Sequence, residues 1–113
     1  MASLAPFATS AAATTGKTVK VSANATPTSV AGSLVCTNTL ATNVLVTNTG
    51  TVAVFVRLSP QATPTATASD VPMPPNSSRV FANPVPNGTL GLAVLSSAAV
   101  AADIYFTPGT GGI

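Results

Sequence analysis

Few side chains in this sequence carry groups that could perform catalysis. The chain has two carboxylates, Asp70 and Asp103, one thiol, Cys36, and no histidine. A carboxylate pair can serve as the acid and base of a glycosidase, but such groups need a cleft and further partners. Because Asp70 lies in a proline-rich loop and Asp103 in a predicted strand, we expect Asp70 to cap a turn. We expect Asp103 to pair with Arg57 or Arg79.

Metal and nucleophile chemistry lack their usual groups as well. A zinc site needs about four nitrogen, sulfur or oxygen ligands, and a calcium site needs a cluster of carboxylates. A nucleophilic serine needs a neighbouring base, and the sequence offers no suitable one. Cys36 follows Leu34 and Val35, so we interpret it as a buried, small apolar side chain. The sequence therefore predicts a protein that is not an enzyme and uses no cofactor, metal or small-molecule substrate.

Charge is unusually scarce in this chain. Charged residues make up 5% of the 113 residues, whereas typical soluble domains have roughly 25%. The low charge suggests that copies of the chain or another partner cover much of its surface. The four cations are scattered rather than clustered, which does not favour a nucleic-acid partner. Arg57 and Arg79 each end or interrupt an apolar strand pattern, and each is either an interface anchor or a solvated strand end.

The two ends of the chain differ from its middle. Residues 1–16 are rich in Ala, Ser and Thr, contain no charge, and resemble neither a secretory signal nor a membrane span of ~20 apolar residues. We expect an extended N-terminal arm over 1–16 and a flexible, glycine-rich tail over 107–113, each ordered only when a neighbour holds it. Together with the two arginines, the candidate interface residues at these ends are Leu4, Pro6, Phe7, Pro108 and Ile113.

Residues 17–106 have the patterns of β-strands. The stretch 43–58 contains two alternating runs rich in valine on either side of Asn48-Thr49-Gly50-Thr51, which predicts a hairpin with a tight turn. The proline-rich stretch 70–76 is expected outside the sheet or along its edge. Further strands are predicted over 17–22, 33–37, 65–68, 78–82, 89–95 and 100–106. Seven to eight short strands with proline and glycine turns predict an all-β protein, an antiparallel β-sandwich or barrel.

Three stretches carry a resemblance to a known family: VLVTNTGTVAVFVRL from Val44, DVPMPPNSSRVF from Asp70, and IYFTPGTGGI from Ile104. Their order resembles that in small capsid cement or decoration proteins of tailed bacteriophages, which are encoded beside the major capsid protein. The resemblance covers roughly residues 17–113 and includes no active-site signature. It implies a jelly-roll-like β-sandwich that binds the outer surface of an icosahedral shell, across the seams between copies of the major capsid protein.

The expected location is thus the virion, and the expected partners are the major capsid protein and other copies of this chain. Dimers and trimers are both compatible with a symmetric shell. An alternative of a different class is a head-fibre or tail-associated sandwich that adheres to a host surface, which would favour clustered exposed aromatics or long polar loops. A secreted pilin-like or surface-layer subunit would need an export signal.

Overall fold

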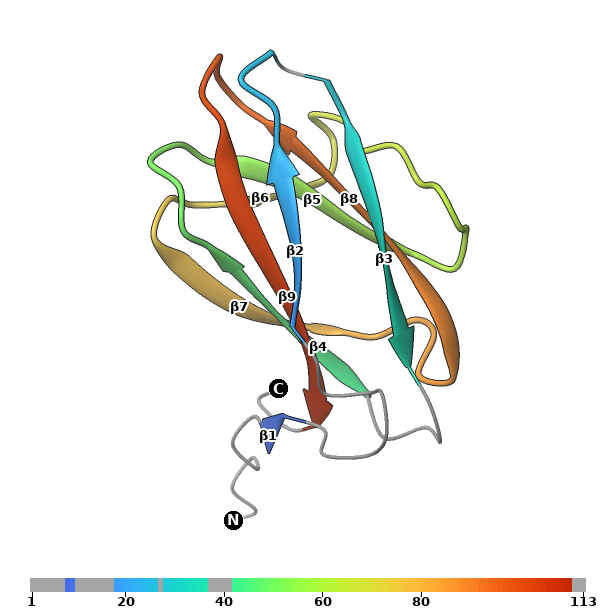
Figure 1. Ribbon diagram of the computed structural model, residues 1–113. Helices are drawn as coiled ribbons and strands as arrows, with labels where there is room; N and C mark the ends of the chain where they lie inside the picture. Colours follow the sequence, from blue (N-terminus) through green and yellow to red (C-terminus); the bar gives the residue numbers. More distant parts are fainter. Residues whose placement is uncertain (1–7, 10–17, 27, 37–41, 111–113) are drawn as a thin grey trace.

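The chain folds into two antiparallel sheets packed face to face (Figure 1). The computed structural model describes residues 8–9, 18–26, 28–36 and 42–110, and this part of the chain contains no helix. The all-β antiparallel sandwich predicted from the strand patterns is confirmed. The strands are β1 Ala8–Thr9, β2 Val19–Ala23, β3 Val30–Cys36, β4 Asn43–Asn48, β5 Val54–Ser59, β6 Val71–Met73, β7 Ser77–Ala82, β8 Gly88–Ser96 and β9 Ala102–Thr110.

The strands are paired in a nested order. β2 pairs with β9, β3 with β8, β4 with β7, and β5 with β6, so the chain resembles one long hairpin whose tip lies between β5 and β6. This hairpin is rolled up, because β4 also pairs with β9 and β5 also pairs with β8. One sheet therefore has the order β2-β9-β4-β7, with β1 beside the far end of β9, and the other has the order β3-β8-β5-β6.

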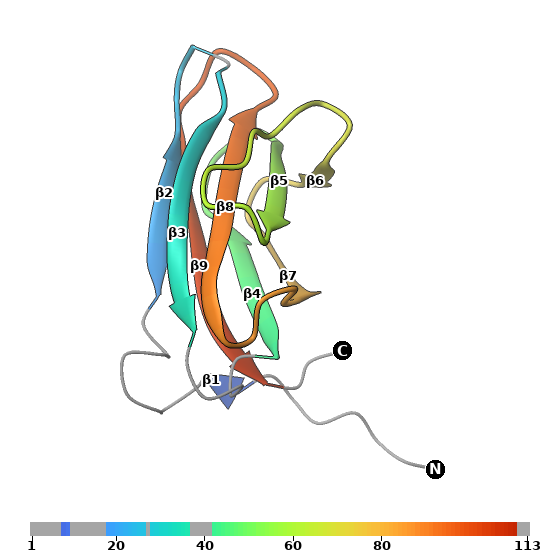
Figure 2. The same cartoon turned by 90° about the vertical axis from the view of Figure 1, so that its right-hand side faces the viewer.

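The core lies between the two sheets and is made mainly of aliphatic side chains. Alternate residues of β4 and β5 face inward, as a pleated strand requires, and the four valines among them are at most 2% exposed. Phe106 of β9 is the largest fully buried side chain in the described part of the chain. Figure 2 shows the two layers from the side, with β2 beside β3 at one side of the sandwich and β6 and β7 at the other.

The predicted hairpin over 43–58 is wrong. Its two runs are strands, but β4 belongs to one sheet and β5 to the other, and they do not pair with each other. Residues 49–53 instead carry the chain across the sandwich. Both runs have apolar residues on each face, but only one face of each strand is buried and the other is half-buried or exposed. The pattern did not indicate which strands would become neighbours.

Asn48 holds this crossing together from inside the core. Its side chain is fully buried, and its Nδ2 group donates hydrogen bonds to the carbonyl oxygens of Val52 and Met73, both at 3.0 Å. Its Oδ1 atom accepts a hydrogen bond from the Gly50 amide at 2.8 Å. A single amide therefore connects the end of β4, the crossing loop and the end of β6, which lie in different sheets.

The edge strand predicted over 65–68 is also wrong. The structure has no strand there, and the nearest strand is β6, in the proline-rich stretch. Asp70 closes a turn over these residues, because its amide donates to the Thr67 carbonyl and its Oδ2 accepts from the Thr67 amide. Pro72 is tolerated because β6 pairs only with β5 and has no strand on its other side in the described part of the chain. The expectation that this stretch runs along a sheet edge is correct.

The last strand is longer than predicted. The expected boundary between sandwich and tail at residue 106 is wrong, because β9 continues to Thr110. Pro108 fits within this strand because β2 pairs with β9 up to Phe106 and β1 pairs with it from Gly109, and no described residue pairs with Pro108 on that side. Of the expected N-terminal arm, only Ala8 and Thr9 belong to the described residues, and they form β1.

Candidate interaction surface

A groove lies at the side of the sandwich where β6 and β7 form the edges of the two sheets. It has a volume of about 360 Å³. Its lining combines aliphatic and aromatic side chains with one ion pair, and consists of Val56, Arg57, Leu58, Asp70, Val71, Phe81, Ala82 and Pro84. We call it the β6–β7 groove.

The register of β7 explains why Phe81, which lines this groove, and its neighbour Arg79 lie on the same face of the sheet. Arg79 lies opposite Val46, and Phe81 lies opposite Val44, in the pairing of β7 with β4. Paired residues of an antiparallel ladder share a face of the sheet, and both valines are fully buried. Arg79 and Phe81 therefore lie on the inner face of the sheet, at the open side of the core.

Arg79 covers the aromatic ring beside it. Its guanidinium carbon lies 5.1 Å from the centre of the Phe81 ring, which is a cation–π arrangement. Arg79 is exposed and Phe81 is half-buried. The pair combines a planar guanidinium group with the apolar ring beneath it. Arginine and aromatic side chains are both enriched at protein interfaces.

Arg57 and Asp70 form an ion pair on the groove wall. The Nε group of Arg57 donates to Oδ1 of Asp70 at 2.9 Å, and their side chains are 44% and 13% exposed. Burial raises the pKa of Asp70, but the hydrogen bond from the Thr67 amide and the hydrogen bond and charge of Arg57 outweigh it and hold this pKa below its ordinary value. The ion pair fixes the start of β6 against β5.

Replacing Asp70 by Asn should therefore have a pH-dependent effect. Because the folded-state pKa is lowered, the carboxylate stabilises the fold above its unfolded-state pKa of about 4, and this stabilisation is lost as the pH falls through the folded-state value. We expect Asp70→Asn to lower the free energy of unfolding by about 1 kcal/mol at neutral pH, a modest figure because Arg57 is partly exposed. Urea unfolding at neutral and strongly acidic pH measures the difference, and an equal loss at both would contradict the assignment.

The other expected interface residues lie elsewhere. Pro108 is fully buried inside the sandwich, so its side chain is not exposed on a protomer surface. Leu4, Pro6, Phe7 and Ile113 lie outside the described residues.

The remaining acid and the thiol have structural partners. The expectation that Asp103 pairs with Arg57 or Arg79 is wrong. Asp103 instead accepts a hydrogen bond at 2.7 Å from Ser22 Oγ on the neighbouring strand. Cys36 is buried, as predicted, and burial raises its pKa although the Asn83 side chain donates to its sulfur at 3.4 Å. Both groups thus have local contacts that account for their positions.

The described residues contain no cluster of three or more His, Cys, Asp or Glu side chains that could hold a metal ion. Among the same residues no helix has the length and apolarity to cross a membrane. The chain matches no protein-family model, no curated protein and no solved structure.

Proposed function

We propose that this protein is a structural component of a phage virion, a cement or decoration protein that binds the outer surface of the capsid. In this account it binds across the seams between copies of the major capsid protein and stabilises the shell. The β6–β7 groove is the surface that receives a capsid segment. The capsid partner rests on the sequence resemblance, and the choice of surface rests on the geometry of the groove.

The nested order of the strands supports this proposal. Pairing the first strand with the last, and so on inward to β5 and β6, is the order in which a jelly roll is wound. Viral capsid proteins are among the proteins that use this arrangement. Proteins with a fold of this kind have many unrelated functions, so the function must be inferred from the residues on the surface.

The observation that carries the proposal is the position of the stretch 70–81. This stretch is one of the three that resemble decoration proteins, and it forms β6 and β7, the edges on either side of the groove. It supplies Asp70, Val71 and Phe81 to the groove lining. It also contains Arg79, which does not line the groove but stacks on Phe81. The sequence pattern and the β6–β7 groove, which combines apolar and charged side chains, therefore coincide.

A cement protein stabilises a shell by mass action. Because it binds the assembled shell and not the separated subunits, opening the shell also requires releasing the bound protein. A groove with an aromatic ring, an exposed arginine and a paired carboxylate offers both apolar burial and directional contacts to a capsid segment. No reacting group is needed for this task.

Arg79 is the most direct test of the groove. We expect Arg79→Glu to weaken binding to capsid shells about tenfold, since an interface arginine often contributes more than 1 kcal/mol. The matched control is Lys20→Glu, which makes the same charge change on β2, at the other edge of the same sheet. Co-sedimentation with shells over a range of protein concentrations measures both.

The control separates a local contact from general electrostatics. If both variants lost the same affinity, long-range attraction between a basic protein and the shell would account for the effect. If neither lost affinity, the groove would not be the docking surface. The proposal requires that Arg79→Glu and Phe81→Ala both lose affinity for shells and that Lys20→Glu does not.

A further inference from the structure

The second feature of interest is the edge of β3, on the opposite side of the sandwich from the groove. In the described part of the chain, the strands of three or more residues that pair on one side only are β2, β3, β6 and β7. The unpaired backbone groups of such an edge can bind another strand, and proteins usually protect them with charge, proline or short length.

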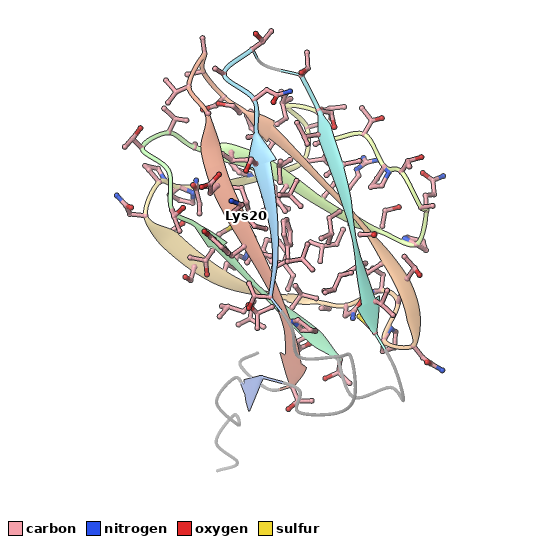
Figure 3. The ribbon with its side chains drawn as sticks, viewed as in Figure 1. Lys20 is labelled. Atoms are coloured by element: carbon pink, nitrogen blue, oxygen red, sulfur yellow. The ribbon has the colours of Figure 1, made fainter. Side chains whose placement is uncertain are left out.

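Three of these edges carry such protection. β2 exposes Lys20, labelled in Figure 3, and β7 exposes Arg79. β6 has only three residues, and one of them is Pro72. A second strand placed beside any of these three would meet a charge or lose a backbone donor.

The edge of β3 carries none of these protections. It is seven residues long, contains neither a charged residue nor a proline, and pairs with β8 along its whole length. Its exposed residues are Ala31, Ser33 and Val35, which alternate with residues that face the core. Val35 is 51% exposed, more than any other large apolar side chain among the described residues.

We infer that β3 pairs with β3 of a second copy of this chain, antiparallel and around a two-fold axis at Ser33. In this register Ala31 of one copy faces Val35 of the other, so each exposed valine is covered by a small side chain. Residues that face the core in one copy align with core-facing residues in the other, because the register keeps the pleat in phase. The two four-stranded sheets would join into one continuous sheet.

A second copy fits this edge because the strand is complementary to itself. It carries no charge, so pairing two copies does not place like charges opposite each other, which would destabilise the pair. Two copies of β2 paired around Lys20, or two copies of β7 paired around Arg79, would place like charges opposite each other. This inference does not rest on the capsid proposal, because it concerns another surface and requires only the protein itself.

Sedimentation equilibrium of the purified full chain tests the pairing. We expect a mass twice the 11.0 kDa of the chain. Ser33→Lys should place two lysines together at the axis and raise the dissociation constant of the dimer at least about tenfold. The matched control is Ser78→Lys, an exposed serine within the β7 edge, which should leave the dimer intact.

A cysteine pair gives a second readout that does not depend on weakening the fold. Under mild oxidation Ser33→Cys should give a covalent dimer, whereas Ser78→Cys should remain monomeric under denaturing, non-reducing conditions. A monomeric native protein would overturn the inference. So would a dimer that persists in folded Ser33→Lys, or equal cross-linking by the two cysteine variants. If the native protein were monomeric and Ser33→Lys abolished its binding to shells, the edge of β3 would instead be a capsid-binding surface.

Discussion

Replacing Asn48 by Ala should lower the free energy of unfolding by about 3 kcal/mol, because it leaves buried backbone groups without partners. The amide of Asn48 satisfies the carbonyls of Val52 and Met73 and the amide of Gly50. The side chain is fully buried, so these groups are not at the protein surface. Urea unfolding at neutral pH measures the loss.

The control for this prediction is Asn24→Ala. Asn24 is exposed and donates a hydrogen bond at 3.3 Å to Thr28 in the turn between β2 and β3. Its loss should cost less than about 1 kcal/mol, because water can replace an exposed partner. Equal losses in the two variants would show that the position of Asn48 between the sheets is not what makes it important.

A methyl group added at Gly91 should be nearly as damaging. A Cβ atom there would overlap the carbonyl oxygen of Gln61 and lie 2.8 Å from Pro64 Cδ. The loop that follows β5 therefore rests directly on the backbone of β8, and only glycine leaves room for it. We expect Gly91→Ala to lower the free energy of unfolding by about 2–3 kcal/mol, since the loop must move away.

Gly32→Ala is the matched substitution in the neighbouring strand β3. Its added methyl group would lie 2.7 Å from the Cγ2 atom of Val21 and would meet no backbone atom. A buried side chain can shift more readily than a backbone carbonyl, so we expect a smaller loss, of about 1 kcal/mol. Thermal unfolding followed by circular dichroism ranks the two variants, and a larger loss for Gly32→Ala would contradict the proposed packing of the loop.

The strands and the sandwich could be predicted from the sequence because they follow from local patterns. Runs rich in valine and threonine, separated by proline and glycine, favour short strands whatever their partners. The pairing could not be predicted in the same way. Asn48-Thr49-Gly50-Thr51 has the composition of a hairpin turn, yet the chain crosses between sheets there because the Asn48 amide bonds to Met73, 25 residues further on.

The candidate surface could be predicted only in part. Because charged residues are rare in this sequence, Arg57 and Arg79 were candidate interface residues. In the structure Arg57 and Phe81 line the groove, and Arg79 stacks on Phe81. Phe81 carried no signal of its own, because an aromatic residue in a strand usually faces a core. Its position at an open side follows from the registers of strands far apart in the sequence, which a local pattern does not specify.

The edge of β3, which no other described strand covers, illustrates the same limit. Its lack of charge and proline is visible in the sequence, but only the sheet order identifies it as an edge. In a central strand the same seven residues would be unremarkable. Composition therefore becomes informative about partners once the topology is known.

The most direct test of the central proposal is co-sedimentation of the full chain with shells of the major capsid protein from the same phage, followed by heating. We expect saturable binding at a fixed number of copies per capsid subunit and a raised temperature of shell disruption. Binding without a thermal gain would contradict the cement role and leave decoration or host adhesion. No binding at all would contradict the capsid proposal and favour an adhesive or tail-associated module.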